Sequence, residues 1–375
     1  MDAPNYVAQV SNYEVPGKED WVWKLNKSLY GTKQAPRQWK AHLVKTLNML
    51  GLTSKDTDEC LSTNHDKTWF LHIHVDDGFI IGKSESMIKE LLTQLSQIYA
   101  IKTKKNPTQH LKYTLSWQLD GLIILHQHDF CTKILDELNM TLSNSIKTPA
   151  PANIHNVVVQ TSTPFSKHTM QKVIGMLNYL ALHTRPDIMF TTNLLSQSVS
   201  EPTMSHWNLV KHLLCYLNGT QGLGIHFTKA QKHKDKLMGW EDSDYATSLV
   251  TKKSHLGYLI TFLGNPISWT TKKQSIVAQS TTKADFVSMN RCSKENDNTG
   301  AITISNEAQL NPNSKHIEVR FQYLHDLVRK NLLKVQLVTT NDMFSDVLTK
   351  ALGTVRHARA TKMLELTYPD KATEG

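Results

Sequence analysis

Residues 69–83 read WFLHIHVDDGFIIGK, and this stretch decides how the rest of the chain is interpreted. Trp69, Leu71, Ile73 and Val75 alternate with Phe70, His72, His74 and Asp76. This alternation is the period of a half-buried β-strand. A second apolar run starts at Phe79. Asp77-Gly78 lies between the runs and is typical of a tight hairpin turn, because Gly tolerates positive φ. The sequence therefore predicts a hairpin whose tip carries the carboxylates of Asp76 and Asp77.

The two adjacent carboxylates have two interpretations. In the first, Asp76, Asp77 and Gly78 form a solvated turn without chemistry. In the second, the carboxylates bind a divalent cation for phosphoryl transfer, since hard cations take carboxylate oxygens and bridge phosphates. Such two-metal sites draw acids from more than one strand. The acids nearest in sequence, at residues 56–66, lie in polar, loop-like sequence, so the surroundings have to decide.

Composition bounds the class of protein. The chain has 375 residues, room for two or three domains, and a net charge of +9, which suits a polyanionic partner. Its four cysteines form no CxxC pair, which argues against a disulfide framework and fits a reducing compartment. The first residues lack a basic-then-apolar signal pattern, and no apolar run reaches membrane-spanning length. We expect an intracellular protein without a membrane partner.

A basic block precedes the first predicted helix. Pro36 suits a first helical turn, apolar residues follow at helical spacing, and Gly51 stands where a C-terminal cap belongs. Lys33, Gln34 and Arg37 therefore gather at a helix N-terminus, where free N–H groups favour a phosphate. An ordinary basic helix start explains the same residues.

Further elements follow from periodicity and from glycine and proline punctuation. Residues 144–164, rich in Pro, Ser, Thr and Asn, read as a linker, and residues 167–227 read as mostly helical. The predicted elements are strands at 21–25, 121–125 and 334–339, three consecutive strands between 239 and 277, and helices at 84–98, 130–138, 280–295, 316–333 and 341–352.

The last region offers four acids on separate predicted elements. Asp242 lies at a predicted strand start, Asp285 on a helix, Asp297 before a short apolar segment and Asp346 on the final helix. Acids on separate elements can converge on one metal site. Zinc is a further alternative at the histidine pairs 72/74 and 126/128, although neither pair has a clear third ligand.

Seven sequence blocks, taken in their order along the chain, resemble a known family. Together they resemble the reverse transcriptase and RNase H part of copia-type LTR retrotransposon polyproteins, from about residue 15 to residue 366. The blocks are KLNKSLYGTKQAPRQW, HVDDGFIIG, HLKYTLSWQLDGLIILHQHDF, IGMLNYLALHTRPDIMF, PISWTTKKQSIVAQSTTKADF, SKHIEVRF and FSDVLTKAL.

The resemblance implies roles for matching positions. Asp76 and Asp77 would be the metal-binding carboxylates of a polymerase palm, with His74 where the family usually has Tyr. The block that holds Lys33, Gln34 and Arg37 resembles the grip on template and nucleotide. The four RNase H acids would be Asp242, Asp285, Asp297 and Asp346, with Asp76, Asp77, Asp242 and Asp346 as metal ligands. The implied cofactor is Mg2+ or Mn2+. The implied partners are an RNA template, a DNA primer, an RNA–DNA hybrid and deoxynucleoside triphosphates, in the cytoplasm (in a virus-like particle) or the nucleus.

Departures from the family pattern lower the expected activity. The family's first palm aspartate lies upstream of the KSLYG block, and we expect this chain to be a truncated copy without it. Asp285 stands where the family has Glu, which shortens the ligand by one methylene. The helix and strand that precede Asp297 in the family are missing, and Ser116 replaces a Gly. We expect polymerase activity to be lost and RNase H activity to be impaired.

The sequence thus predicts an α+β fold: a partial reverse-transcriptase palm and thumb (1–150), a linker and helical connection (151–230), an incomplete RNase H-like α/β domain (231–355) and a C-terminal tail (356–375). Two rival hypotheses stay open. One is a non-catalytic nucleic-acid-binding protein that keeps the basic groove. The other is a remnant without a stable fold, because the missing helix and strand leave an unpaired edge.

Overall fold

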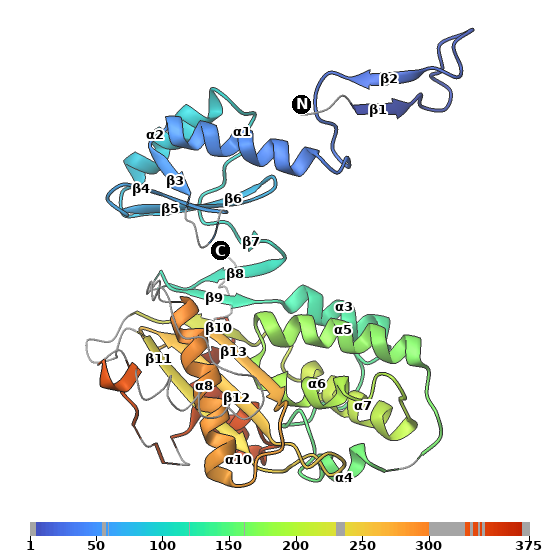
Figure 1. Ribbon diagram of the computed structural model, residues 1–375, viewed down its shortest axis with the longest axis vertical. Helices are drawn as coiled ribbons and strands as arrows, with labels where there is room; N and C mark the ends of the chain where they lie inside the picture. The colour runs from blue at the N-terminus through green and yellow to red at the C-terminus, as the bar shows by residue number, and fades with distance from the viewer. Residues whose placement is uncertain are drawn as a thin grey trace, which may run out of the picture. The chain divides into compact units, whose positions relative to one another are not determined.

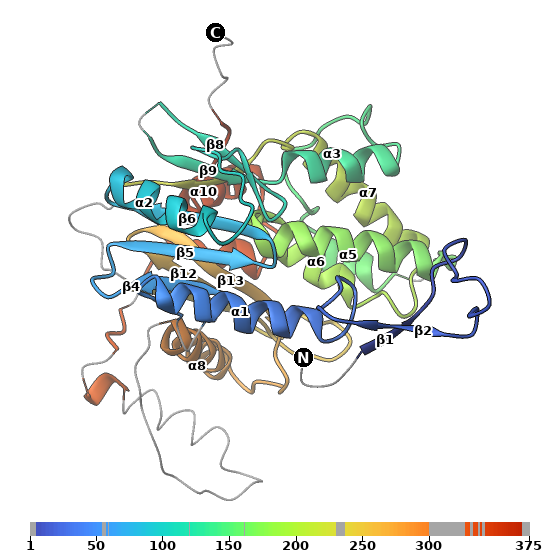
Figure 2. The ribbon, with the colours of Figure 1, turned by 90° about the horizontal axis from the view of Figure 1, so that it is seen from above.

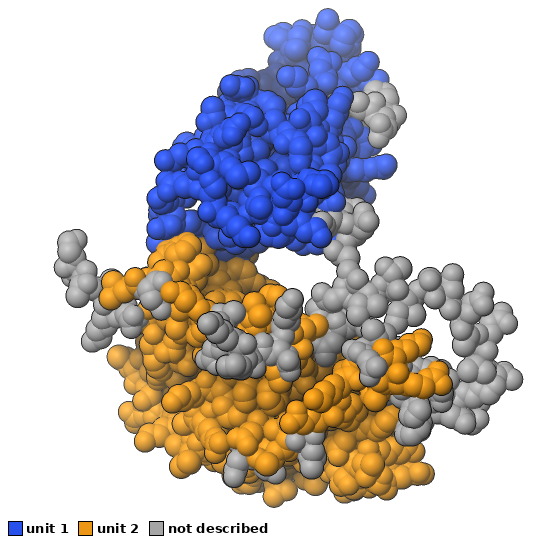
Figure 3. Space-filling model, turned by 90° about the vertical axis from the view of Figure 1, so that its left-hand side faces the viewer, with its two compact units in different colours: residues 1–111 blue, residues 112–375 orange. Residues whose placement is uncertain are grey.

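A computed structural model places the chain in two compact units, residues 1–111 and 112–375 (Figure 3). Each unit is described by itself. The division falls at residue 111, whereas the sequence suggested a boundary near residue 150. The described residues are 5–54, 58, 60–119, 121–160, 162–229, 237–299, 327–330, 333–336, 338–339 and 342–369, with residues 5 and 295–299 described without side chains.

Unit 1 begins with an antiparallel pair of strands and continues into a four-stranded sheet of order β3-β4-β5-β6, which is antiparallel throughout (Figure 1). The short strand predicted around residues 21–25 is confirmed as β2. The elements are β1 (Asn5–Ala8), β2 (Val22–Leu25), α1 (Ala35–Met49), β3 (Leu52–Ser54), β4 (Leu61–Asn64), β5 (Trp69–His74), β6 (Asp77–Gly82), α2 (Glu85–Ser96) and β7 (Gln109–His110).

The core of unit 1 confirms the predicted alternation in β5. Trp69 and Leu71 are buried, while Phe70, between them, is exposed. The buried face packs against Leu47 of α1 and Leu91 of α2, so both helices cover the same face of the sheet (Figures 1 and 2). The period-two pattern thus fixed which side of the hairpin faces the core.

The hairpin turn lies two residues earlier than predicted. His74 pairs with Asp77, so the turn residues are Val75 and Asp76, and Gly78 pairs with Ile73 inside the ladder. Packing explains the difference, because this register seats Leu71 beside Ile80 over the core. It also places Gly82 opposite Trp69, where an added Cβ would lie 2.8 Å from the Trp69 Cβ. Core contacts therefore outweighed the turn preference of Asp77-Gly78.

Unit 2 holds an antiparallel sheet of order β14-β10-β9-β8, a helical layer and a second antiparallel sheet, β11-β12-β13 (Figure 1). Its elements are β8 (Tyr113–Trp117), β9 (Ile123–His126), α3 (His128–Glu137), α4 (Ile154–Val158), α5 (Lys167–His183), η1 (Pro186–Ile188), α6 (Met189–Ser196), α7 (Met204–Asn218), β10 (Gly224–Phe227), β11 (Leu237–Asp244), β12 (His255–Phe262), β13 (Asn265–Lys273), α8 (Thr281–Thr299), η2 (Phe344–Leu348), α10 (Thr354–Met363) and β14 (Leu366–Thr367).

One hydrophobic core runs through unit 2. It joins the predicted apolar stripes of α5 and α7, for example Leu177 and Leu213, to Leu259 of β12 and Leu364 after α10. The segments expected as helical connection, RNase H-like domain and C-terminal tail therefore share buried contacts. Strand β12 is buried on both faces, since Tyr258 and Ile260 pack under α8 in a smaller cluster of their own. Figures 1 and 2 show α8 lying across this sheet.

Several predicted elements differ from the structure. The expected linker contains α4, and its Ile154 is fully buried. The final helix expected at residues 341–352 shrinks to η2, and the described residues of 334–339 form no strand. Most of the helix expected at 316–333 lies outside the described residues. No pattern in the sequence predicted α10 and β14, which pack through Ala360 and Leu366.

A buried ion pair anchors the helical layer. The Arg185 guanidinium donates two hydrogen bonds to Asp187, at 2.9 and 2.7 Å, with both side chains almost fully buried. Arg185 also donates to the carbonyl oxygen and hydroxyl of Thr220, and the Tyr216 hydroxyl donates to Asp187. Burial raises the pKa of Asp187, but the charge of Arg185 outweighs it and holds that pKa below its usual value. The pair ties the end of α5 to the end of α7.

No helix among the described residues has the length and apolar character needed to cross a bilayer.

Candidate functional site

The predicted catalytic hairpin ends in a strained turn. Val75 has φ +57°, a left-handed conformation that a β-branched residue rarely adopts. The Trp39 indole N–H donates a 2.7 Å hydrogen bond to the Val75 carbonyl oxygen. Strained backbone of this kind persists where surrounding contacts over-determine it. The turn therefore presents Asp76 and Asp77, both exposed, in an orientation fixed from outside the hairpin.

Trp39 also brings the basic block to the hairpin. It lies in the second turn of α1, whose N-cap is Gln34 and whose first turn holds Pro36 and Arg37. Lys33 and Arg37 are exposed. The structure thus brings Lys33, Gln34 and Arg37 to the end of α1 that is bonded to the tip with Asp76 and Asp77.

Histidines line the outer face of this hairpin. The centroid of the His110 ring lies 5.7 Å from that of His72, edge to face, and 5.1 Å from that of Phe79, with the two rings tilted. Burial lowers the pKa of His110, and the neighbouring His72 adds to the effect. The other histidine pair predicted for zinc is engaged elsewhere, because the His126 ring nitrogens meet the Ser116 hydroxyl at 2.8 Å and the His128 N–H at 3.3 Å. The geometry gives the zinc alternative no support.

A second candidate site lies on β11, β12 and β13. Asp242, in the second half of β11 rather than at its start, pairs with Gly257, which pairs in turn with Thr271. An added Cβ at Gly257 would lie 2.7 Å from the Leu348 Cβ, so the glycine lets η2 approach the sheet. The Thr271 hydroxyl donates to the Leu348 carbonyl oxygen at 2.6 Å. This row of three residues seats the end of η2 beside Asp242.

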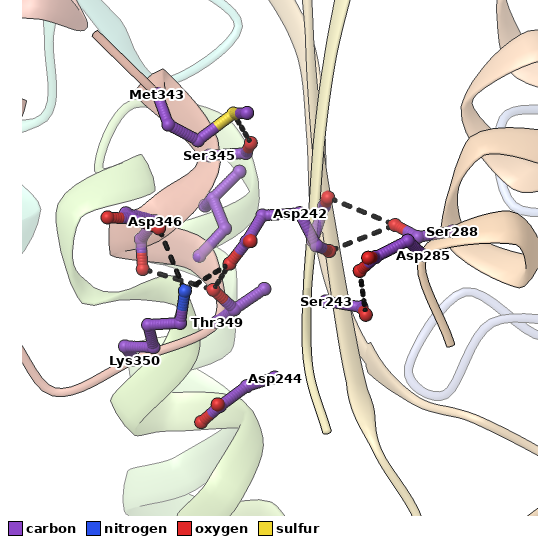
Figure 4. A network of polar contacts seen from close by, with 12 residues as sticks. Asp242, Ser243, Asp244, Asp285, Ser288, Met343, Ser345, Asp346, Thr349 and Lys350 are labelled. Carbon is purple, nitrogen blue, oxygen red and sulfur yellow. Dashed lines mark hydrogen bonds and ion pairs between the residues drawn. The ribbon is translucent and has the colours of Figure 1, made fainter. Parts of the chain in front are cut away.

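Two of the four predicted RNase H acids meet there around a lysine (Figure 4). The Lys350 Nζ lies 3.0 Å from Asp242 Oδ2 and 3.0 Å from Asp346 Oδ1. The Thr349 hydroxyl donates to Asp242 Oδ2, and Arg356 bonds Asp346 Oδ2 at 2.8 Å. Burial lowers the pKa of Lys350, but the charges of Asp242 and Asp346 outweigh it and raise that pKa above its usual value.

The remaining acids take other positions. Asp285 accepts a 2.6 Å hydrogen bond from the Ser243 hydroxyl, on the α8 side of β11 and away from Asp346 (Figure 4). Asp297 lies in α8, and its side chain is outside the described residues. Asp244 was missed from the sequence, although it follows Asp242 at strand period. Burial raises the pKa of Asp244 to about 6, while Lys350 counteracts the shift.

Glu241 was also missed. Burial raises its pKa to about 8, against a hydrogen bond to Ser288 and with a further upward push from the charge of Asp285. Its Oε2 atom is buried without a hydrogen-bond partner in the described part of the chain. Glu241, Ser243 and Asp285 thus form a polar seam under α8, separate from the Asp242–Asp346 pair.

The donor chemistry of the Asp242–Asp346 pair fits a hard cation, because carboxylate oxygens are the ligands that Mg2+ and Mn2+ prefer. In the structure, the cation between these carboxylates is the ammonium group of Lys350. Among the described residues, no three Asp, Glu, His or Cys side chains are grouped closely enough to hold a metal ion.

Comparison with known proteins supplies the family. Residues 1–152 match the family model for reverse transcriptase (RNA-dependent DNA polymerase). The retrovirus-related Pol polyprotein from transposon TNT 1-94 of Nicotiana tabacum is 31% identical over 92% of this chain and 28% of its own length. The chain belongs to the Pol polyproteins of copia-type LTR retrotransposons. The family recognised from the seven sequence blocks is therefore confirmed.

The chain is similar to further proteins. The Pol polyprotein from transposon RE2 of Arabidopsis thaliana is 29% identical over 93% of this chain and 25% of its own length. An uncharacterized mitochondrial protein of the same plant, AtMg00810, is 32% identical over 58% of this chain and 88% of its own length. The chain spans about a quarter of the length of the TNT 1-94 and RE2 Pol polyproteins. No solved structure matches it. The mixed α/β architecture is consistent with a reverse-transcriptase relative.

Proposed function

We propose that unit 1 is a reverse-transcriptase palm segment whose hairpin tip serves metal-dependent nucleotidyl transfer. Asp76 and Asp77 would hold Mg2+ or Mn2+, which neutralises the phosphates and polarises the reacting oxygen. The observation that carries this proposal is the hydrogen bond from Trp39 to Val75, because it joins the acidic tip to the basic start of α1.

Lys33, Gln34 and Arg37 would position the nucleic acid in this proposal. Arg37 and Lys33 offer exposed positive charge at a helix N-terminus, where the helix dipole also favours phosphate. Arg can hold a phosphate through two parallel hydrogen bonds, whereas Lys acts as a point charge. The partners would be an RNA template with a DNA primer, and deoxynucleoside triphosphates.

We propose an RNase H-like role for the Asp242–Asp346 site, with an RNA–DNA hybrid as substrate. The carboxylates of Asp242 and Asp346 come from separate elements and converge, as a metal-assisted hydrolysis site requires. Asp285 and Asp297 remain the further predicted ligands. In the structure Asp285 is bonded to Ser243, and it would have to turn from that partner to join the pair.

Both activities are impaired in this proposal. At the hairpin, no third Asp, Glu, His or Cys is grouped with Asp76 and Asp77 among the described residues, whereas two-metal sites draw acids from more than one strand. Asp285 is engaged away from Asp346, and the ammonium group of Lys350 already neutralises the two converging carboxylates. Metal sites lose function when one ligand is held loosely or misplaced.

A primer-extension and binding experiment tests the proposal. The full chain is given a DNA primer on an RNA template with Mg2+, together with Asp76→Asn and the exposed control Asp66→Asn. We expect template–primer binding that Mg2+ strengthens in the wild type and in Asp66→Asn but not in Asp76→Asn, with little synthesis. Robust synthesis lost in Asp76→Asn would overturn the impairment, and binding indifferent to Mg2+ would overturn the metal site.

A non-catalytic nucleic-acid-binding protein is the second candidate, favoured by the Lys350 ion pairs. The affinity for nucleic acid would then come from contacts to its phosphates alone. Replacing Lys33 and Arg37 together by Met would reduce the slope of log affinity against log salt by roughly 0.9 per lost phosphate contact. The paired replacement of Lys102 and Lys104, both exposed, is the control.

A further inference from the structure

We propose that Lys350 is a built-in cation that holds the metal position between Asp242 and Asp346, so that a divalent ion enters only by displacing it. This inference rests on the RNase H-like role proposed above and describes how that site is regulated. It makes Lys350 a positioning residue, acting on the carboxylates rather than on the substrate.

The geometry at the carboxylates supports an occupied position. Asp242 and Asp346 come from β11 and η2, and the Lys350 Nζ lies 3.0 Å from one oxygen of each. Like charges that converge in a half-buried site repel one another unless a cation lies between them. The side chains of Asp242 and Asp346 are only 16% and 6% exposed, so solvent alone screens them poorly. The ammonium supplies the charge that a metal would otherwise bring.

Packing of the backbone places Lys350. Its N–H donates to the Asp346 carbonyl oxygen at 3.0 Å, and the preceding Thr349 donates through its hydroxyl to Asp242. Gly257 allows this segment to lie against the sheet, as shown by the 2.7 Å that would separate an added Cβ from Leu348. The backbone of Lys350 is therefore held in a well-packed turn, and from this position its side chain reaches both acids.

The Lys350 side chain can also move away from the two carboxylates. The Lys350 side chain is 32% exposed, more than either carboxylate that it bridges. Lysine carries its charge on a flexible four-carbon stem and is strongly hydrated, so it can exchange the carboxylates for water. Arg356 would still balance the outer oxygen of Asp346 after this move. A metal ion and the ammonium group would then compete for the same two carboxylates.

Metal binding to variants of the full chain tests this clamp, by which we mean the pair of ion pairs that Lys350 makes with Asp242 and Asp346. Free Mn2+ is measured by electron paramagnetic resonance for wild type, Lys350→Met, Lys350→Arg and Lys272→Met, an exposed lysine on β13. We expect Lys350→Met to bind Mn2+ at least about tenfold more tightly, since a positive charge has left the site. Lys350→Arg and Lys272→Met should bind as the wild type does, and Asp242→Asn should remove the gain. Equal affinity of Lys350→Met and wild type, or a gain that survives Asp242→Asn, would overturn the clamp.

A second measurement uses the wild type alone, because Lys350→Met leaves two carboxylates unbalanced and can weaken folding. Lysines are acetylated briefly with and without Mn2+, and each site is quantified by mass spectrometry. Displacement predicts that Mn2+ raises labelling of Lys350 several-fold and leaves Lys272 unchanged. Labelling of Lys350 that does not respond to Mn2+ would overturn the inference.

Cleavage of an RNA–DNA hybrid is assayed in parallel. Displacement of Lys350 by Mn2+ without any cleavage would overturn the RNase H-like function and leave the clamp intact. Cleavage without displacement would do the reverse.

Discussion

The indole N–H of Trp39 lies 2.7 Å from the carbonyl oxygen of Val75, and this single hydrogen bond joins α1 to the tip of the β5–β6 hairpin. Trp39 also packs edge-on against Tyr99, whose hydroxyl bonds His42 and Thr46 along the same helix face. The acidic turn is therefore held by a helix that itself carries the basic block.

Trp39→Phe tests this link. The change keeps the aromatic packing but loses the bond to Val75, which contributes about 1 kcal/mol. We expect faster hydrogen exchange at residues 73–78 and weaker Mg2+-dependent binding of template–primer. Trp23→Phe on β2 is the control. Unchanged exchange in Trp39→Phe would show that the turn holds its shape without the bond.

Val75→Gly and Gly78→Ala distinguish the observed turn from the one that the sequence suggested. Val75 has φ +57°, so glycine there should stabilise the hairpin by roughly 1 kcal/mol or more. Gly78 lies in the ladder, where an added Cβ meets Ile73 at an ordinary 3.8 Å, so Ala there should cost little. Local stability is measured by hydrogen exchange. The opposite ranking would place the turn at Asp77-Gly78.

Arg185→Met should destabilise unit 2 by about 3–5 kcal/mol, because Asp187 would stay buried without its counter-charge. Chemical unfolding followed by circular dichroism measures the loss. The double variant Arg185→Met with Asp187→Leu should recover part of it. The control is Arg359→Met, since Arg359 pairs with Asp342 at the exposed surface, where ion pairs contribute at most about 1 kcal/mol. Equal losses in the two single variants would contradict the buried pair's role.

Gly257→Ala should destabilise the Asp242 site by about 1–3 kcal/mol through overpacking against Leu348. The matched control is Gly175→Ala in α5, where an added Cβ meets nothing within 4 Å and the higher helix propensity of Ala should stabilise. Thermal unfolding reports both. If Gly257→Ala were as stable as wild type, η2 would not be seated by the glycine.

Stability should fall below neutral pH because of His255. Burial lowers the pKa of His255 to about 4, with His155 and Lys273 adding to the shift. The Gln197 amide and the Thr247 hydroxyl bond its ring, and Phe190 packs against it. The unfolded chain binds a proton at higher pH than the folded chain, so this contribution is complete above about pH 6.5 and is lost as pH falls toward 4. It amounts to roughly 3 kcal/mol.

His255→Gln should flatten the dependence of unfolding free energy on pH between 4 and 6.5. His65→Gln, at a fully exposed ring, should leave the slope unchanged. A slope that persists in His255→Gln would assign the effect to another group, such as His155, whose pKa burial also lowers.

Local pattern was enough for much of the fold. The alternation through β5 determined its buried face, because side chains on a strand have a fixed period that neighbours cannot change. Helical stripes placed α5 and α7 for the same reason. The Asp76–Asp77 pair and the basic block at residues 33–37 were also visible, since their residue types and spacing carry the chemistry.

Long-range packing decided the rest. The turn moved to Val75 and Asp76 because Ile80 and Gly82 had to meet Leu71 and Trp69. No hydrophobic periodicity predicted α10 and β14. They form because the core of unit 2 buries Ala360 and Leu366. The meeting of Asp242 with Lys350 depends on Gly257, which has no side chain to signal it and acts only by letting η2 approach. The sequence by itself determined the family, the strand and helix faces and the candidate acids. Only the tertiary structure decided which acids meet and which cation lies between them, because contacts between residues so far apart in the chain depend on how the sheet and helices pack.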